Sequence, residues 1–231
     1  MKKFGFLIFL GVLAVGLVAA IASPFGKLNS SPFEFHFNGV RGSGNVITDR
    51  RDIDDFHGIE VGNAIQVDVV AQKDFALEVE ADDNIVPLIR TEVSGGILRI
   101  SCEKSISKAS SIRIRVSAPD IDSLDVSGAS TVSLAGVDNS ALSVESSGAS
   151  KVRVDGTTSK LTVDISGASK VDAQNLTAQN GSVETSGASS ASVNVTGSLR
   201  ADASGASHIN YSGSPKDVVK KSSGASSVSG Q

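Results

Sequence analysis

The sequence contains very few aromatic and sulfur-containing residues. Its 231 residues include no Trp, one Tyr, one Met and one Cys. A single Cys excludes a disulfide framework and any metal cluster held by several thiolates. The three histidines, at positions 36, 57 and 208, have no ligand-like spacing. We therefore expect no metal site and no other cofactor.

The chain also lacks an excess of positive charge. It has 21 Lys and Arg against 25 Asp and Glu, a formal net charge of -4. Nucleic-acid binding depends largely on Lys and Arg contacts with phosphates. We therefore expect no nucleic-acid partner.

Residues 4–22 carry no charge and follow Lys2 and Lys3. This layout is typical of an export signal, and Ala20 and Ala22 place small residues where a signal peptidase cleaves. The same 19-residue run is long enough to cross a bilayer. Residues 1–22 are thus expected to be a signal peptide or an uncleaved N-terminal anchor, which would be the only contact with a membrane. Both alternatives place the body of the protein in the periplasm or at the cell surface.

Serine and glycine are abundant instead, and they recur in register. There are 38 Ser, 27 of them after residue 122, and 23 Gly. The tetrapeptide Ser-Gly-Ala-Ser begins at residues 127, 147, 166, 186, 204 and 223, with spacings of 18 to 20 residues. Six copies at a nearly fixed period predict a solenoid.

Apolar residues alternate with polar ones on both sides of each tetrapeptide, as at Val132 and Leu134 or at Val152 and Val154. Period-2 alternation indicates β-strands whose apolar side chains face inward. Each repeat then supplies two short strands and two bends, and the rungs stack about 4.8 Å apart. The sequence predicts an all-β fold, a right-handed parallel β-helix or closely related β-solenoid.

Within this fold the tetrapeptides are expected to form corners. Glycine permits a bend at positive φ, alanine would point into a corner that accepts only a methyl group, and the serine hydroxyls would stack in ladders or bond to backbone amides. The predicted corner residues are Gly128, Ala129, Gly148, Ala149, Gly167, Ala168, Gly187, Ala188, Gly205, Ala206, Gly224 and Ala225.

The N-terminal half repeats this frame less regularly. Residues 59–69 match residues 124–134, with Asn63 in the glycine place. Further strands are expected at 76–81, 97–102 and 112–117, and a helical turn at about 85–91. We expect a single domain over 46–231, with irregular rungs over 46–120 and regular ones over 121–229. Residues 23–45, with alternating Phe33, Phe35 and Phe37, are expected to form a linker or capping strand.

Several of these segments resemble a known family. The segments at 56–61 (Phe-His-Gly-Ile-Glu-Val) and 77–85, together with the recurring Ser-Gly-Ala-Ser, are similar to the putative auto-transporter adhesin, head GIN domain family. The similarity covers about residues 50 to 228. It implies an exported domain of β-helical rungs and supplies no catalytic or binding residues.

Enzymatic residues can be sought among the carboxylates, because β-helix enzymes that act on polysaccharides use paired acids in a cleft. The candidates are Asp155, Asp164 and Asp172, near Lys151, Arg153, Lys160 and Lys170. Their alternation with inward valines predicts outward, solvated side chains, and His208 has no partner at triad spacing. No catalytic residues are therefore predicted.

Two other polar features have simpler interpretations. The run Asp82-Asp83-Asn84 could hold calcium, but a turn stabilised by side-chain-to-backbone bonds is favoured. A serine face could bind ice or a crystalline polymer, although serine is already required at the corners. The leading hypothesis is a non-catalytic, adhesin-like or surface-binding envelope protein, whose partner is an unknown envelope protein or surface polymer. The alternatives are a membrane-anchored periplasmic scaffold and, third, a polysaccharide-acting enzyme.

Overall fold

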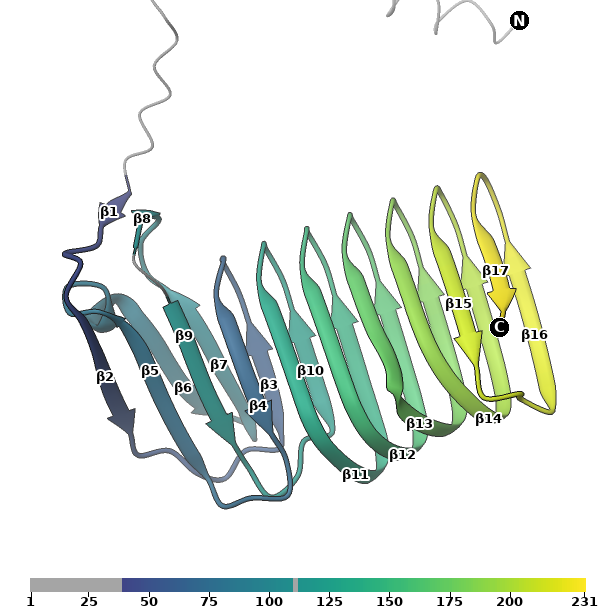
Figure 1. Ribbon diagram of the computed structural model, residues 1–231, viewed down its shortest axis with the longest axis horizontal. Coiled ribbons are helices and arrows are strands. Elements are labelled where there is room, and N and C mark those ends of the chain that lie inside the picture. Colours follow the sequence, from purple (N-terminus) through teal and green to yellow (C-terminus); the bar gives the residue numbers. More distant parts are fainter. Residues whose placement is uncertain (1–38, 110–111) are drawn as a thin grey trace, which may run out of the picture. The chain divides into compact units, whose positions relative to one another are not determined.

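A computed structural model describes residues 39–109 and 112–231, which belong to one compact unit built almost entirely from β-strands (Figure 1). Residues 1–22 and the phenylalanines of 33–37 lie outside the described residues. The elements in chain order are β1 (Val40–Arg41), β2 (Val46–Arg51), β3 (Gly58–Val61), β4 (Gln66–Val70), β5 (Ala76–Asp82), the 3-10 helix η1 (Val86–Leu88), β6 (Ile89–Ser94), β7 (Ile97–Cys102), β8 (Ile106–Lys108), β9 (Ile112–Ser117), β10 (Ser123–Val126), β11 (Thr131–Ser146), β12 (Lys151–Ile165), β13 (Lys170–Thr185), β14 (Ser190–Ala203), β15 (His208–Ser212), β16 (Asp217–Ser222) and β17 (Ser227–Gly230).

Successive coils of the chain pair in parallel with one another. Strands β11, β12, β13 and β14 follow in order, with Val132 beside Val152 and Val152 beside Val171. In Figure 1 each coil runs down the near side and returns up the far side while advancing toward β17, which is a right-handed coil. The predicted parallel β-solenoid is therefore confirmed.

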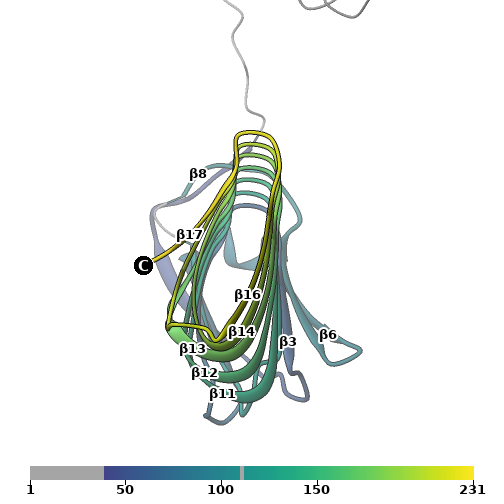
Figure 2. The ribbon, with the colours of Figure 1, turned by 90° about the vertical axis from the view of Figure 1, so that its right-hand side faces the viewer.

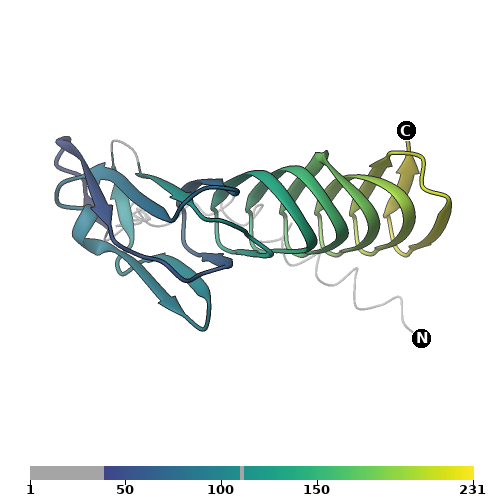
Figure 3. The ribbon, with the colours of Figure 1, turned by 90° about the horizontal axis from the view of Figure 1, so that it is seen from below.

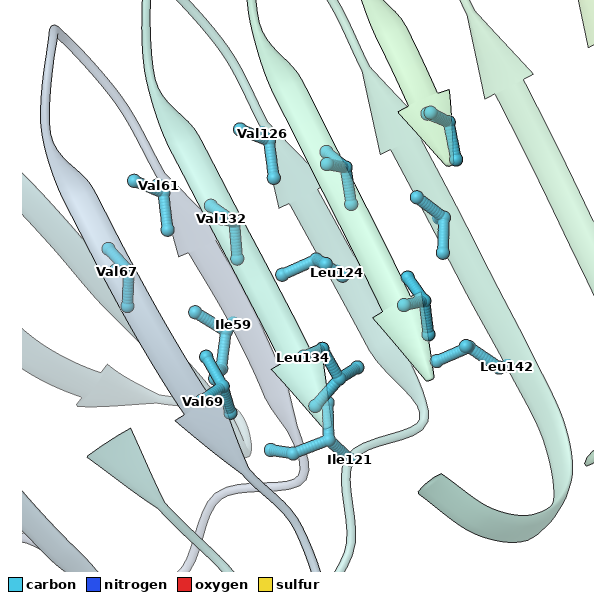
Figure 4. Packing of buried hydrophobic residues seen from close by; sticks show 14 of the residues in the cluster. Ile59, Val61, Val67, Val69, Ile121, Leu124, Val126, Val132, Leu134 and Leu142 are labelled. Carbon is cyan, nitrogen blue, oxygen red and sulfur yellow. The ribbon is translucent and has the colours of Figure 1, made fainter. Parts of the chain in front are cut away.

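The core is a narrow aliphatic layer between the near and far sides of the coil. Side chains from both sides meet there, as Figure 4 shows for Val132, Leu134 and Leu124. The positions predicted to face inward are buried in every regular rung through Ile209. In the regular rungs each inward position stacks on its own copy one rung away, so Val, Leu, Ile and Ala fill the layer. The buried aromatic Phe56 lies before β3 and packs on Phe75.

Each regular rung has two bends, as the sequence predicts, but only one of them is a sharp corner. Strands β11 to β14 are 14 to 16 residues long and continue around the opposite end of the coil as one curved strand. Pairing slips there, for example between Leu134 and Val137, and Gly136 has a φ of +77°. Bulges of this kind bend a strand without ending it. Figure 2, looking along the stack, shows the sharp corners superimposed at one end and the curved segments at the other.

The first rung is formed by β3 and β4, as the alignment of residues 59–69 predicts. Asn63 lies at its corner with a φ of +72°. Strand β3 pairs in parallel with β10, and β4 with β11. The degenerate sequence therefore continues the solenoid into the N-terminal half.

The strands before and around this rung are less regular: β7 pairs in parallel with β3 and β9 in parallel with β4, but antiparallel pairs lie beside them. The strands predicted at 76–81, 97–102 and 112–117 exist as β5, β7 and β9, but β5 pairs antiparallel with both β2 and β9, and β6 pairs antiparallel with β7. The tight turn at Gly95 and Gly96, both at positive φ, reverses the chain between β6 and β7. The helical turn is the short η1, because β6 begins at Ile89. Figure 3 shows this less regular part beside the even rungs.

Arg51 ties the two sides of the coil together in this region. From β2, its guanidinium donates to the carbonyls of Ile89 and Val86, at 2.6 and 3.1 Å, and to the Thr91 hydroxyl at 2.9 Å. Asp49 accepts from its Nε at 3.0 Å. These bonds satisfy backbone carbonyls at a sheet edge, where the next rung would otherwise supply the donors.

The core ends differently on the C-terminal side, at β15, one strand before the terminal β17. Tyr211 occupies the inward position that Val193 holds one rung earlier, and the Lys220 ammonium lies 4.6 Å from its ring centroid. A cation over an aromatic face is a favourable contact that also places charge at the end of the core. No helix within the described residues is long and apolar enough to cross a membrane.

Candidate functional site

The Ser-Gly-Ala-Ser tetrapeptides form one exposed edge of the solenoid. Their six glycines have φ values between +74° and +79°. At each step the alanine amide donates to the glycine carbonyl of the previous rung, as from Ala149 to Gly128 at 2.8 Å. The edge is thus a continuous hydrogen-bonded ladder.

The alanines of this edge do not point into the corner, which corrects the expectation from the sequence. Ala129 and its five equivalents are exposed, whereas the last serine of the first five tetrapeptides is buried. The buried hydroxyl donates to the carbonyl three residues earlier, from Ser150 to Ser147 at 3.0 Å and from Ser189 to Ser186 at 2.8 Å. It also stacks on its copies, as between Ser150 and Ser169 at 3.2 Å. A serine therefore fills the corner because it can satisfy a carbonyl there, which alanine cannot.

The face formed by β3, β10 and the returning halves of β11 to β14 carries a column of carboxylates, which we call the carboxylate column. Each member is paired in register with the next, and all are exposed or half-exposed. Its members are Glu60, Asp125, Glu145, Asp164, Glu184 and Asp202. Neighbouring rungs lie about 4.8 Å apart, so like charges directly face each other at a destabilising distance.

An ion pair neutralises the carboxylate column at one end, and at the other end Asp202 is paired in register with Lys221. Arg99 donates to Glu60 at 2.8 Å, and within residues 39–109 and 112–231 the other five carboxylates have no cation within 4 Å. Burial raises the pKa of Asp125, and the neighbouring charges of Glu145 and Glu60 raise it further. A small hollow of about 130 Å³ lies among Asp164, Glu184 and Asp202. The described residues contain no group of three His, Cys, Asp or Glu that could hold one metal ion.

The opposite face, formed by β5, β9, β4 and the first halves of β11 to β13, carries mixed charge. Ion pairs neutralise most of it, namely Arg115 with Glu80 at 3.0 Å, Arg113 with Asp68 at 3.6 Å and Arg153 with Asp172 at 3.8 Å. Opposite charges on adjacent strands stabilise a sheet. The two faces therefore differ: the carboxylate column repeats negative charge over six strands, whereas the mixed face carries both signs and joins most of them in ion pairs.

The carboxylates considered for catalysis are not gathered into one site. Asp172 lies on the mixed face beside Arg153, whereas Asp164 lies in the carboxylate column on the other face. Asp155 is half-buried, and its Oδ1 has no hydrogen-bond partner in the described part of the chain. This differs from the solvated position that the alternation predicts, since the strand begins to curve at Gly156. A general acid and a general base must both reach the same scissile bond, which the placement of Asp164 and Asp172 on opposite faces does not allow.

The run Asp82-Asp83-Asn84 forms a turn whose polar atoms are used within the protein. Asp82 accepts from the Gly44 amide at 3.1 Å, Asp83 from Asn45 Nδ2 at 3.0 Å, and Asn84 Oδ1 from the Ser43 amide at 3.0 Å. Hydrogen bonds from Ser43 and Asn45 lower the pKa of Asp83. These contacts hold residues 43–45 against the turn, as the side-chain-to-backbone interpretation predicts.

His57 and Cys102 make local contacts. The His57 Nδ1 lies 2.9 Å from Asp122 Oδ1, and this hydrogen bond, with the charge of Asp122, raises the pKa of His57. The half-buried Cys102 thiol donates to the Lys104 carbonyl at 3.2 Å. His208, on β15, lies two strands from Asp172 on β13 and three strands from Asp155 and Asp164 on β12. Its Nδ1 contacts the Ser207 carbonyl.

Comparison with known families gives a match to the model described as "Putative auto-transporter adhesin, head GIN domain" over residues 55–215. The chain belongs to this family. No curated protein matches the head GIN chain. Among solved structures, a putative adhesin from Bacteroides fragilis is 24% identical with a TM-score of 0.68, covering 84% of this chain and all of that one. A putative lipid binding protein from Parabacteroides distasonis is 21% identical with a TM-score of 0.50, covering 83% and 99%. At these identities the likeness shows the shared fold.

The carboxylate column is the feature that the sequence analysis missed, although a signal for it is present. Each carboxylate lies two residues before a corner, as Asp125 precedes Ser127 and Glu145 precedes Ser147. The polar residues at a fixed distance from each corner, and not only the apolar ones, therefore carry the signal for the column. Its isolation from cations could not have been found this way, because the cations are brought near or kept away by pairing between rungs.

Proposed function

We propose that this head GIN protein is an exported, non-catalytic, adhesin-like protein that holds a macromolecular target against a flat face of its solenoid. The carboxylate column is the observation that supports this proposal. Within the described residues, the four adjacent carboxylates from Asp125 to Glu184 have neither an ion pair nor a cation beside them in register, so they repel one another and lower stability. Departures from the most stable arrangement are expected where a surface serves a function.

The form of the column suits an extended contact better than a reaction. A catalytic centre needs groups that converge on a few atoms, whereas a column spreads its charges along the solenoid at rung spacing. Several weak contacts at fixed spacing add up when one target spans them. We therefore assign the column to contact with a positively charged region of the target, and the family's adhesin description supports a surface-binding role.

Location is tested by surface protease treatment of intact cells and by sequencing the mature N-terminus. We expect digestion on intact cells and a mature chain that begins at Ser23. Complete protection together with an uncleaved residue 4–22 segment would instead support the membrane-anchored periplasmic scaffold. Recovery of the protein in the soluble cytoplasmic fraction would contradict export altogether.

Target contact is tested with the purified mature chain and beads coated with amine, hydroxyl or carboxyl groups. We expect retention on amine beads only, and its loss in Glu145→Gln/Asp164→Asn/Glu184→Gln. A matched control, Glu78→Gln/Asp68→Asn/Asp172→Asn, removes the same formal charge from the mixed face, where Glu78 on β5 lies 3.9 Å from Arg115. It should keep most of the retention. Equal losses in both variants would show that net charge, and not the column, is responsible.

A further inference from the structure

The mixed face contains a trench that the proposed function does not use. It has a volume of about 470 Å³ and lies along β11, where the short side chains of Thr131 and Ser133 stand between longer ones. Gln66 and Asp68 flank them on β4, and Lys151 and Arg153 flank them on β12, each in register. The buried Val132 and Val152 form part of its floor. The volume lies within the range of sites for small organic ligands.

The polar groups around the trench divide into two sets. The first set lies at the borders of the trench and is already ion-paired, Asp68 with Arg113 and Arg153 with Asp172. Within residues 39–109 and 112–231, no hydrogen bond or ion pair engages the side chains that remain. These are Gln66, Thr131, Ser133, Lys151 and Lys170.

The two free ammonium groups are neighbours. Lys151 and Lys170 are paired in register on β12 and β13, so their backbones lie about 4.8 Å apart, and both side chains are exposed. Like charges at this spacing repel unless an anion lies between or above them. The trench therefore offers two positive charges on one side and hydroxyl and amide groups along its length.

The width of the trench restricts its occupant to a single extended chain. Strands β4 and β12 are two strand spacings apart, about 9.6 Å, and their side chains narrow this further. An α-helix with its side chains is about 10–12 Å wide and does not enter. An extended peptide gains most of its affinity by pairing with a sheet edge. Here β4, β11, β12 and β13 are each paired on both sides, so no edge is available.

We propose that this trench binds an acidic polysaccharide, with a carboxylate or sulfate group between Lys151 and Lys170 and sugar hydroxyls bonded to Gln66, Thr131 and Ser133. A polysaccharide chain is extended, carries many hydroxyls and needs no backbone pairing, so it fits the side chains that the trench presents. A second copy of this protein is a poorer occupant, because its net charge of -4 opposes self-association. This site lies on the face opposite the carboxylate column and does not depend on it.

Binding is tested by calorimetry on the purified mature chain with four defined probes. The acidic probes are a galacturonate hexamer for carboxylate and sulfated dextran for sulfate, and the comparisons are neutral dextran and a glutamate hexamer. We expect one or both acidic sugars to bind, with affinity falling as salt rises, and the two comparisons to bind at least about tenfold more weakly. If neither acidic sugar binds, or if neutral dextran binds equally well, the proposal is wrong.

Residue assignment is tested with Lys151→Gln/Lys170→Gln, which should weaken binding about tenfold or more, as expected for the loss of two charge-assisted contacts. Lys160→Gln/Lys221→Gln is the matched control, since it removes the same charge from exposed lysines on the other face. It should change affinity less than about twofold.

Equal losses of affinity in both variants would show that net charge, and not these two lysines, is responsible for binding. Tight binding of the glutamate hexamer through the same lysines would assign the trench to an acidic protein instead. These measurements do not test retention on amine beads, which depends on the opposite face. Each of the two proposals can therefore be refuted without the other.

Discussion

Replacing Gly148 by alanine should destabilise the solenoid by about 1.5–3.5 kcal/mol. Gly148 has a φ of +77°, which costs a residue with a Cβ about 1–2 kcal/mol. Its added Cβ would lie 2.5 Å from the Gly128 carbonyl oxygen of the previous rung, which also accepts the Ala149 amide at 2.8 Å. Relieving this clash separates the rungs at the corner and weakens that hydrogen bond, a further loss of about 0.5–1.5 kcal/mol. The shift of the urea midpoint measures the total.

Gly95→Ala separates the two contributions. Gly95 has a φ of +61°, but its added Cβ would meet nothing within 4 Å. Only the backbone cost applies there, and the effect of alanine on the unfolded chain is common to both variants. Gly148→Ala should therefore exceed Gly95→Ala by about 1 kcal/mol. Equal losses would refute the argument that close approach between rungs requires glycine at the corners.

Three further outcomes follow from exposure and charge. Ala149→Leu should lower the free energy of unfolding, measured from the urea midpoint, by less than about 0.5 kcal/mol, because Ala149 is exposed. A large loss of stability would mean that the Ala149 side chain faces the core after all. Glu145→Gln should raise stability at pH 7 by a few tenths of a kcal/mol, since it removes one of the charges that face Asp125, and a decrease would contradict repulsion within the column. The raised pKa of His57 means that its stabilisation is complete below pH 6.5 and is lost as the pH rises through the higher folded value. Asp122→Asn should therefore flatten the fall in stability above pH 6.5, measured by urea titration at several pH values, and an unchanged slope would exclude this pair as its cause.

Much of the fold follows from one property of the sequence, its period. Positions that recur every 18 to 20 residues must occupy equivalent places in a stack, so Val132, Val152 and Val171 could be assigned to the core without coordinates. The same phase places Asn63 at the first corner. The structure shows why a side chain is tolerated at this first corner: the Asn63 Oδ1 accepts a hydrogen bond from the Cys102 amide at 3.1 Å. At the next corner, by contrast, a Cβ added to Gly128 would collide with the Asn63 backbone.

The remaining features depend on contacts that a period does not encode. Periodicity identifies the corner but does not decide whether Ala149 or Ser150 faces inward, because that choice follows from which group can satisfy the Ser147 carbonyl. Nor does it decide that β5 pairs antiparallel with β9, since strands outside the repeat pair according to the turns between them. The sequence by itself therefore determined the stacking and the core of this protein. Only the tertiary structure decided the corner interior, the closure at Arg51 and the difference between its two charged faces. The last two arise between residues distant in sequence, and the corner interior depends on which side chain can bond a carbonyl three residues earlier.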